Sequence, residues 1–78
     1  MSRALLDFVV PWLVDYPDEV VITEAEGEAG EVVFELTVHP DDMGKVIGKN
    51  GRIIRSLRSL ARASGGHDGA PVMVEVVD

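Results

Sequence analysis

The chain has 78 residues, the size of one small domain, and it contains no cysteine. Disulfide bonds and thiolate metal sites are thereby excluded, which suits a reducing compartment. The longest apolar run, from Phe8 to Val14, is far shorter than the roughly 20 residues that span a bilayer. It also lacks the basic start and small-residue cleavage site of a signal peptide. We expect a soluble cytoplasmic protein.

Charge is distributed unevenly along the chain. The net charge is −7, yet residues 45–62 carry +6 and contain no acidic residue, which leaves −13 for the remainder. A local positive excess of this kind favours an anionic ligand, although a solvated helix face is the commoner explanation of a charge run. The basic residues of this stretch are Lys45, Lys49, Arg52, Arg55, Arg58 and Arg62.

The N-terminal residues 3–15 predict a helix with an unusually wide apolar surface. A proline inside a helix loses a backbone hydrogen bond and clashes with the preceding turn, so we expect a kink or a break at Pro11. The helix should end before Pro17, because the residue before a proline disfavours helical dihedrals. Two apolar stripes lie side by side: Leu5, Phe8, Val9 and Trp12, and then Leu6, Val10, Leu13 and Val14.

Two strands are predicted next, at residues 19–26 and 31–39. Both are rich in β-branched residues, and the second alternates apolar positions with a period of two. The intervening residues 27–30 contain two glycines, which favours a tight turn and an antiparallel hairpin. The expected buried face of the second strand is Val32, Phe34, Leu36 and Val38.

Two helices and a strand complete the pattern. Pro40, followed by two aspartates, predicts the start of a helix, and Gly48 predicts its end. A second, amphipathic helix is predicted over residues 52–64, then a loop at 65–69 and a strand at 72–77. Its expected apolar side is Ile53, Leu57, Leu60 and Ala61.

The predicted order is α-β-β-α-α-β, which belongs to the α+β class. Because the connection from the second strand to the third passes through two helices, these strands should be parallel neighbours. We therefore expect a three-stranded mixed sheet with the helices packed on one face, forming a single domain over residues 1–78.

The most informative segment runs from Val46 to Ile54 and contains Gly48-Lys49-Asn50-Gly51. Glycine allows the first helix to end with positive φ and leaves room for an approaching backbone. The amides at the start of the second helix favour a phosphate, and Lys49 and Arg52 add positive charge there. Two glycines between helices are by themselves weak evidence for a ligand-binding loop. The apolar Val-Ile before the loop, the Ile-Ile after it and the six-element order make the pattern specific.

On these residues the whole chain resembles the KH domain family in its type II arrangement, and more narrowly the small single-KH proteins of bacteria. The resemblance implies an RNA-binding protein without catalysis, whose loop clamps the backbone of about four nucleotides of single-stranded RNA. The bases would lie in an apolar groove between the two helices and the last strand. The residues matched to the motif are Ile47, Gly48, Lys49, Asn50, Gly51, Arg52 and Ile54, to which charge and proximity add Lys45 and Arg55.

The resemblance also implies pairing, either as a homodimer or as a heterodimer with a larger Jag-type KH protein. It further implies a post-transcriptional regulator or RNA chaperone with effects on cell shape. The alternative function is a protein-interaction module that binds RNA weakly or not at all. Stacking platforms of the RRM or OB type are disfavoured, because every aromatic residue lies outside the basic segment.

Enzymatic and metal chemistry find little support. The segment from Gly44 to Asn50 has three residues between its glycines, and Asn50 stands where a P-loop needs a serine or threonine for magnesium. His39 and His67 lack nearby partner ligands, so we expect no metal and no cofactor. Ser64, His67 and Asp68 are too close in sequence to form a catalytic triad.

Overall fold

The computed structural model describes residues 2–63 and 71–77; the remaining residues are drawn in grey in the figures. The helices and strands occur in the predicted order α-β-β-α-α-β. Their bounds are α1 Ser2–Leu13, β1 Val21–Glu26, β2 Val32–Thr37, α2 Met43–Ile47, α3 Arg52–Ala63 and β3 Val72–Val77, with 3₁₀ turns at Pro17–Glu19, Pro40–Asp42 and Lys49–Gly51. The predicted loop at 65–69 lies outside the described residues.

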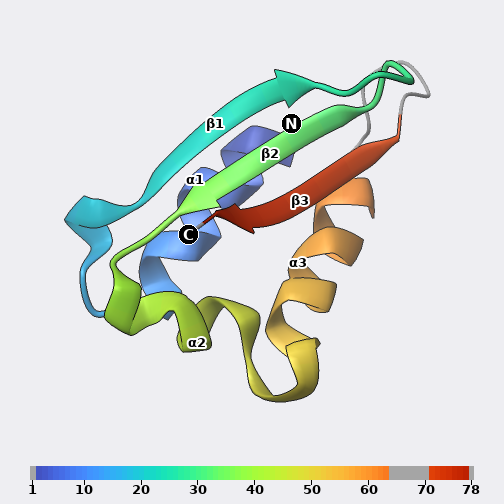
Figure 1. Ribbon diagram of the computed structural model, residues 1–78. Coiled ribbons are helices and arrows are strands. Elements are labelled where there is room, and N and C mark those ends of the chain that lie inside the picture. The colour runs from blue at the N-terminus through green and yellow to red at the C-terminus, as the bar shows by residue number, and fades with distance from the viewer. Residues whose placement is uncertain (1, 64–70, 78) are drawn as a thin grey trace.

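The three strands form one sheet in the order β1-β2-β3 (Figure 1). β1 and β2 are antiparallel, and β2 and β3 are parallel, which confirms the predicted mixed sheet. The hairpin closes through the backbone amide of Gly27, which donates to the carbonyl of Glu31 at 2.8 Å. Glycine at position 30 adopts φ +82°, a conformation that the turn requires and that other residues rarely adopt.

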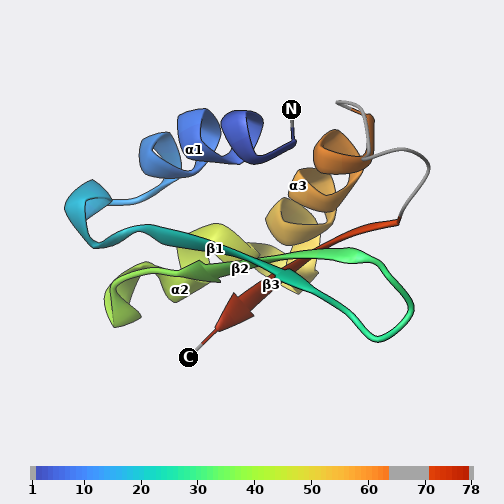
Figure 2. The ribbon, with the colours of Figure 1, turned by 90° about the horizontal axis from the view of Figure 1, so that it is seen from above.

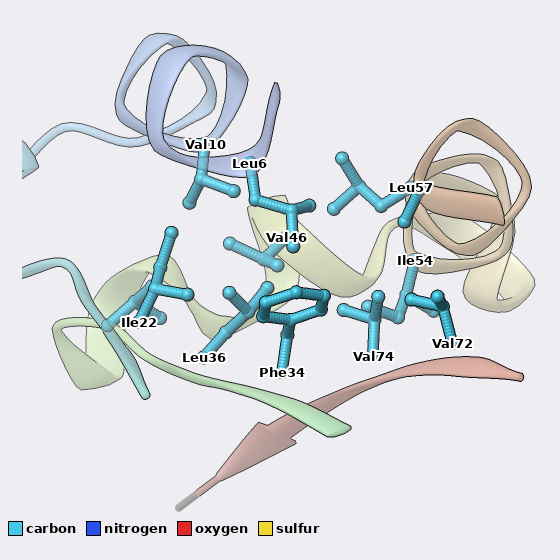
Figure 3. Close-up of a cluster of buried hydrophobic side chains, with 12 residues drawn as sticks. Leu6, Val10, Ile22, Phe34, Leu36, Val46, Ile54, Leu57, Val72 and Val74 are labelled. Carbon is cyan, nitrogen blue, oxygen red and sulfur yellow. The ribbon is translucent and has the colours of Figure 1, made fainter. Parts of the chain in front are cut away.

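Helices α1 and α3 lie on the same side of the sheet (Figure 2). Among the side chains predicted to be buried, Val32 is only partly buried and Val38, just after β2, is buried. Phe34 and Leu36 are fully buried. They point toward Leu6 and Val10 of α1, while Val46 brings α2 into the same cluster (Figure 3). None of the helices in the described part of the chain is long and apolar enough to cross a membrane.

The break expected at Pro11 is wrong, because α1 runs without interruption through Pro11 and ends at Leu13. Pro11 lies in the last turn, where the helix has few further hydrogen bonds to lose. The carbonyl of Asp7, which would pair with the missing amide, belongs to an exposed residue and can bond to water. The helix continues past Pro11 and ends at Leu13, two residues before the predicted end.

The apolar side predicted for α3 is partly wrong. Leu57 and Ala61 are buried as expected, but the third buried residue is Ile54, and Leu60 is 48% exposed. Ile54, Leu57 and Ala61 follow the i, i+3, i+7 spacing of one helix face. Ile53, also predicted for this side, is only partly buried, so the buried face is turned toward Ile54.

Candidate nucleic-acid interface

The segment Gly48-Lys49-Asn50-Gly51, hereafter the GxxG loop, joins α2 directly to α3 through backbone conformations that favour glycine. The φ angles are +78° at Gly48, +57° at Asn50 and +72° at Gly51. Asparagine is among the few other residues that tolerate the left-handed region, so residue type and backbone agree at three of the four positions. The chain reverses within a single 3₁₀ turn, closed by the amide of Gly51 donating to the carbonyl of Gly48 at 3.1 Å.

Gly48 is required for a second reason. A Cβ atom at this position would lie 2.6 Å from Cγ1 and 2.9 Å from the backbone nitrogen of Ile53. At Gly51, in contrast, the nearest atom to such a Cβ would be 3.9 Å away, in Ile54. The absence of a side chain at Gly48 thus lets the end of α2 pack directly against the first turn of α3.

Arg55 stabilises the loop from the first turn of α3. Its Nη2 donates a hydrogen bond of 2.8 Å to the backbone carbonyl of Asn50. This hydrogen bond satisfies a backbone carbonyl of the loop. It also holds the positive charge of the guanidinium close to the loop. The structure thus shows that Arg55 supports the loop.

Lys49 and Arg52 supply the positive charge at the loop itself. Both side chains are exposed, and neither makes an ion pair or side-chain hydrogen bond within the described residues. A shallow hollow continues from the loop along the exposed side of α3. Its lining is Arg52, Arg55, Ser56, Ser59 and Leu60. Cationic and hydroxyl side chains beside an open glycine turn suit a phosphodiester backbone.

Lys45 differs from the other predicted cations because it is paired within its own chain. Its Nζ forms an ion pair with Asp15 and lies 3.7 Å from Oδ1 of Asp42. The hydrogen bond to Asp15 raises the pKa of Lys45, against a smaller opposing effect of burial, and both carboxylates add to the rise. The structure thus gives Lys45 a role in joining α2 to the segment after α1, and two carboxylates partly neutralise its charge.

Asp42 has a role that the sequence pattern did not reveal. The side chain is fully buried and accepts hydrogen bonds from the backbone amides of Asp15, at 3.1 Å, and Tyr16, at 3.0 Å. Burial by itself raises the pKa of Asp42, but these two amides, Lys45 and His39 together hold it below its ordinary value. No spacing rule links residue 42 to residues 15 and 16, so sequence reasoning assigned Asp42 only to a helix start.

His39 caps the start of the 3₁₀ turn before α2. Its Nδ1 accepts a hydrogen bond from the amide of Asp41 at 3.1 Å, and its ring stacks on Tyr16 with centroids 4.0 Å apart. Together with Asp42, this contact fixes α2 to the segment that follows α1. In the described residues there is no group of three histidine, cysteine or acidic side chains that could hold a metal ion. His67, Ser64 and Asp68 lie outside those residues.

The two apolar residues predicted to contact RNA differ in accessibility. Ile47, the last residue of α2, is 37% exposed beside the loop, whereas Ile54 is 7% exposed and belongs to the core. Ile47 therefore presents apolar surface beside the loop. Ile54 acts mainly by fixing α3 to the sheet, where Val72 and Val74 pack against it (Figure 3).

Comparison with known proteins agrees with this geometry. The family described as KhpA/KhpB, KH domain, matches residues 3–76. The "RNA-binding protein KhpA" of Oceanobacillus iheyensis is 56% identical over 62 residues, which cover 80% of this chain and 81% of the relative. Proteins of the same name from Clostridium acetobutylicum and Streptomyces coelicolor are 43% and 44% identical over 75 and 78 residues. These alignments cover 96% and 100% of this chain, and 99% and 94% of the relatives. No solved structure matched the chain. The fold, the loop and these relatives together show that the chain belongs to the KhpA/KhpB family of KH domains.

Proposed function

We propose that this chain, as one KH domain over residues 1–78, binds single-stranded RNA without catalysing a reaction. The observation that carries the proposal is the GxxG loop, in which Gly48 and Gly51 have positive φ and Gly51 leaves open space beside Lys49 and Arg52. The name "RNA-binding protein KhpA", carried by several relatives of nearly the same length, supports the same function.

The loop would hold the RNA backbone, and the adjoining surface would receive the bases. A phosphate can approach the loop closely at Gly51, where the space of a side chain is open, and Lys49 and Arg52 then neutralise its charge. Ile47 offers apolar surface at the side of the loop. Arg55 supports the loop through Asn50, so the phosphate contact forms with little rearrangement. Of the predicted cations, Lys45 has the weakest claim to RNA contact, because it is already paired with two carboxylates.

We further propose that the chain works as part of a pair, in post-transcriptional regulation or as an RNA chaperone in the cytoplasm, with the effect on cell shape that the family resemblance implies. The partner would be a second copy or the larger KH protein KhpB, with which the chain shares its family. Support comes from two aromatic side chains on the outside of α1, Phe8 and Trp12, which no other part of the described chain covers.

The decisive variant replaces Lys49 and Asn50 with aspartate in one protein. Two carboxylates at the point of phosphate contact should reduce the affinity for a mixed pool of single-stranded RNA by at least tenfold, because they replace attraction with repulsion. Both side chains are exposed, so the fold should persist. A matched control changes Ala4, Ala29 and Thr37 to aspartate, which alters net charge equally at exposed positions away from the loop.

Fluorescence anisotropy with labelled RNA gives the affinities, and circular dichroism reports the fold. The control should bind nearly as well as the original protein, and equal binding by the loop variant would refute the assignment of this site.

A salt titration gives a second measurement of the same binding. With about three or four phosphate contacts, log K should fall with log salt at a slope of about −2 to −3. A slope near zero would favour the alternative function, a protein-interaction module.

A further inference from the structure

The three-stranded sheet has one face that the described helices leave uncovered. Helices α1 and α3 lie on the other side of the sheet (Figure 2), and Val46 brings α2 into the core on that same side. Side chains alternate between the two faces along a strand, and the buried positions within all three strands are even-numbered. The odd-numbered side chains therefore form the uncovered face, hereafter the open face. They are Val21, Thr23, Ala25, Val33, Glu35, Thr37, Met73, Glu75 and Val77.

The strand register sorts the open face into three rows that cross the sheet. Successive rows are two residues apart along each strand, which is about 6.7 Å. An acidic row lies between two mainly apolar rows, and the apolar side chains of Val21, Met73 and Val77 are exposed. The rows consist of Ala25, Val33 and Met73, then Thr23, Glu35 and Glu75, and finally Val21, Thr37 and Val77.

Glu35 and Glu75 lie side by side in the middle row without a cation. They are register partners in the parallel strands β2 and β3, and neighbouring strands are about 4.8 Å apart. Neither carboxylate forms an ion pair with a described residue. Like charges at paired positions destabilise a sheet, and Glu35 is partly buried, where screening by salt is weaker. Solubility of an uncovered face requires charge, but it does not require two like charges at paired positions. A cation placed over this row would be attracted by both carboxylates.

An apolar pocket adjoins the open face at the end of β3. Its volume is about 260 Å³, and its lining is Val38, Pro40, Met43 and Val77. Val77 thus belongs both to the open face and to the pocket. Since an apolar cavity of about 150 Å³ can hold a benzene molecule, this pocket has room for one aliphatic or aromatic side chain.

Charge decides among the possible occupants of the open face. RNA is disfavoured, because its phosphates would face the two carboxylates. A second copy of the chain is disfavoured as well. In a two-fold pair the same surface meets itself, so the middle row would lie against its own copy and bring four carboxylates together. A protein partner with a basic residue between two apolar residues complements all three rows.

We propose that the open face binds a helix of another protein that carries an apolar, a basic and an apolar residue at positions i, i+4 and i+8. Residues four apart lie on the same side of a helix and rise by about 6 Å, which matches the spacing of the rows. The basic residue lies between Glu35 and Glu75, and one apolar residue enters the pocket beside Val77. The open face is separate from the GxxG loop and from the exposed aromatic residues of α1, so this docking does not depend on RNA binding.

The probe is a synthetic peptide of about 20 residues, long enough to form helix in water, built mainly from alanine and glutamine. It carries leucine, arginine and leucine at i, i+4 and i+8, and a second peptide has glutamate in place of the arginine. An NMR titration of isotope-labelled protein measures the affinity and locates the contact. The arginine peptide should bind with a dissociation constant below about 1 mM. It should shift the methyl signals of Val21, Met73 and Val77 on the open face, and of Met43 in the pocket. The glutamate peptide should bind about tenfold more weakly or worse, because repulsion replaces attraction.

A pair of charge-removing variants tests the acidic row. Glu35→Gln combined with Glu75→Gln removes both charges and keeps the size of the side chains. This variant should bind the arginine peptide about fivefold more weakly, as expected for the loss of two surface ion pairs, and should no longer distinguish arginine from glutamate. The matched control combines Glu24→Gln with Glu26→Gln, which changes net charge equally at exposed even-numbered positions of β1. The control should keep the preference for arginine.

Equal affinity of the original protein for both peptides, or signal shifts confined to α1 or the GxxG loop, would overturn the proposal. Failure of the arginine peptide to bind at millimolar concentration would overturn it as well. Loss of the arginine preference in the control variant would show that net charge alone acts and would refute the role of Glu35 and Glu75. Thermal melting followed by circular dichroism checks that the variants are folded. If the open-face variant does not fold, the comparison of the two peptides on the original protein still decides.

Discussion

At the scale of single residues, the GxxG loop depends on backbone conformations that the residue types permit. Gly48, with φ +78° and ψ +169°, lies in a region that is occupied almost entirely by glycine. The prediction that Gly48 ends one helix and that Gly51 precedes the next is confirmed, because a glycine between two amphipathic patterns is a direct local signal. The crowding of Gly48 by Ile53 depends on how the two helices pack, and sequence reasoning missed it.

Substitution of the two glycines by alanine should have unequal effects. Gly48→Ala combines a strained backbone with a Cβ only 2.6 Å from Ile53, so it should lower the free energy of unfolding by at least about 2 kcal/mol. Gly51→Ala meets no close atom, so only the backbone strain of about 1–2 kcal/mol should remain. Urea denaturation measures both values. A larger loss for Gly51→Ala would contradict the described packing.

Asp42 provides a pH-dependent contribution to stability. Its pKa in the folded protein lies below the value of about 3.9 expected in the unfolded chain, so the unfolded state binds the proton more readily. The contribution is therefore complete above about pH 4 and is lost as the pH falls through the folded pKa. Asp42→Asn should lower the melting temperature at pH 7, because the amides of Asp15 and Tyr16 donate to different oxygens of Asp42 and asparagine replaces one of them with an NH2 group that can only donate.

The difference in melting temperature between the original protein and Asp42→Asn should shrink as the pH falls from 6 to about 2, since a protonated Asp42 resembles asparagine. Asp41→Asn is a suitable control because Asp41 is exposed next to the same turn. A difference that stays constant over the whole pH range would show that the charge of Asp42 does not contribute to stability.

At the scale of elements, hydrophobic periodicity predicted β2 and β3 well. β3 matches its predicted bounds, and the buried positions of β2 are those of the alternating pattern. The helices were harder to predict, because their boundaries and faces depend on what packs against them. Leu60 and Ile54 are both apolar, and only the position of α3 over β3 decides that Ile54 is buried.

The behaviour of α1 leads to a prediction about Pro11. The helix continues through this residue, so alanine there would supply an amide that can donate to the carbonyl of Asp7. Pro11→Ala should raise the free energy of unfolding by about 1–3 kcal/mol, measured in urea, with the lower end expected for the last turn of a helix. A decrease would mean that the proline's restriction of the backbone stabilises the exit from α1 more than the hydrogen bond would.

At the scale of the whole molecule, positive charge is concentrated in one part of the chain. The basic residues of α2, the GxxG loop and α3 stand apart from an otherwise acidic chain, a distribution that was visible in the sequence. The sequence did not show which of these cations have ion-pair partners. Asp15 is distant in sequence from Lys45, and Asp42 is brought close to it by the turn before α2. The tertiary structure thus reduces a uniform positive stretch to a smaller set of available charges.

Part of the apolar surface of α1 is not covered by the rest of the described chain. Leu6 and Val10 turn one side of α1 into the core, while Phe8 is 69% and Trp12 80% exposed on the remaining surface. Two exposed aromatic side chains one helical turn apart are unusual on a monomer and typical of an interface. The rest of the described chain therefore leaves part of the wide apolar surface predicted for this helix uncovered.

We therefore expect self-association that depends on this side of α1. Sedimentation at micromolar concentrations should show a species heavier than 8.4 kDa whose fraction rises with concentration. Replacing Phe8 and Trp12 together with glutamate should yield monomers that remain folded, because neither side chain belongs to the core. Val21→Ser, at an exposed apolar residue of β1, should leave association unchanged. A single species of monomer mass at every concentration would exclude the homodimer and leave pairing with a different chain as the remaining explanation for the exposed aromatics.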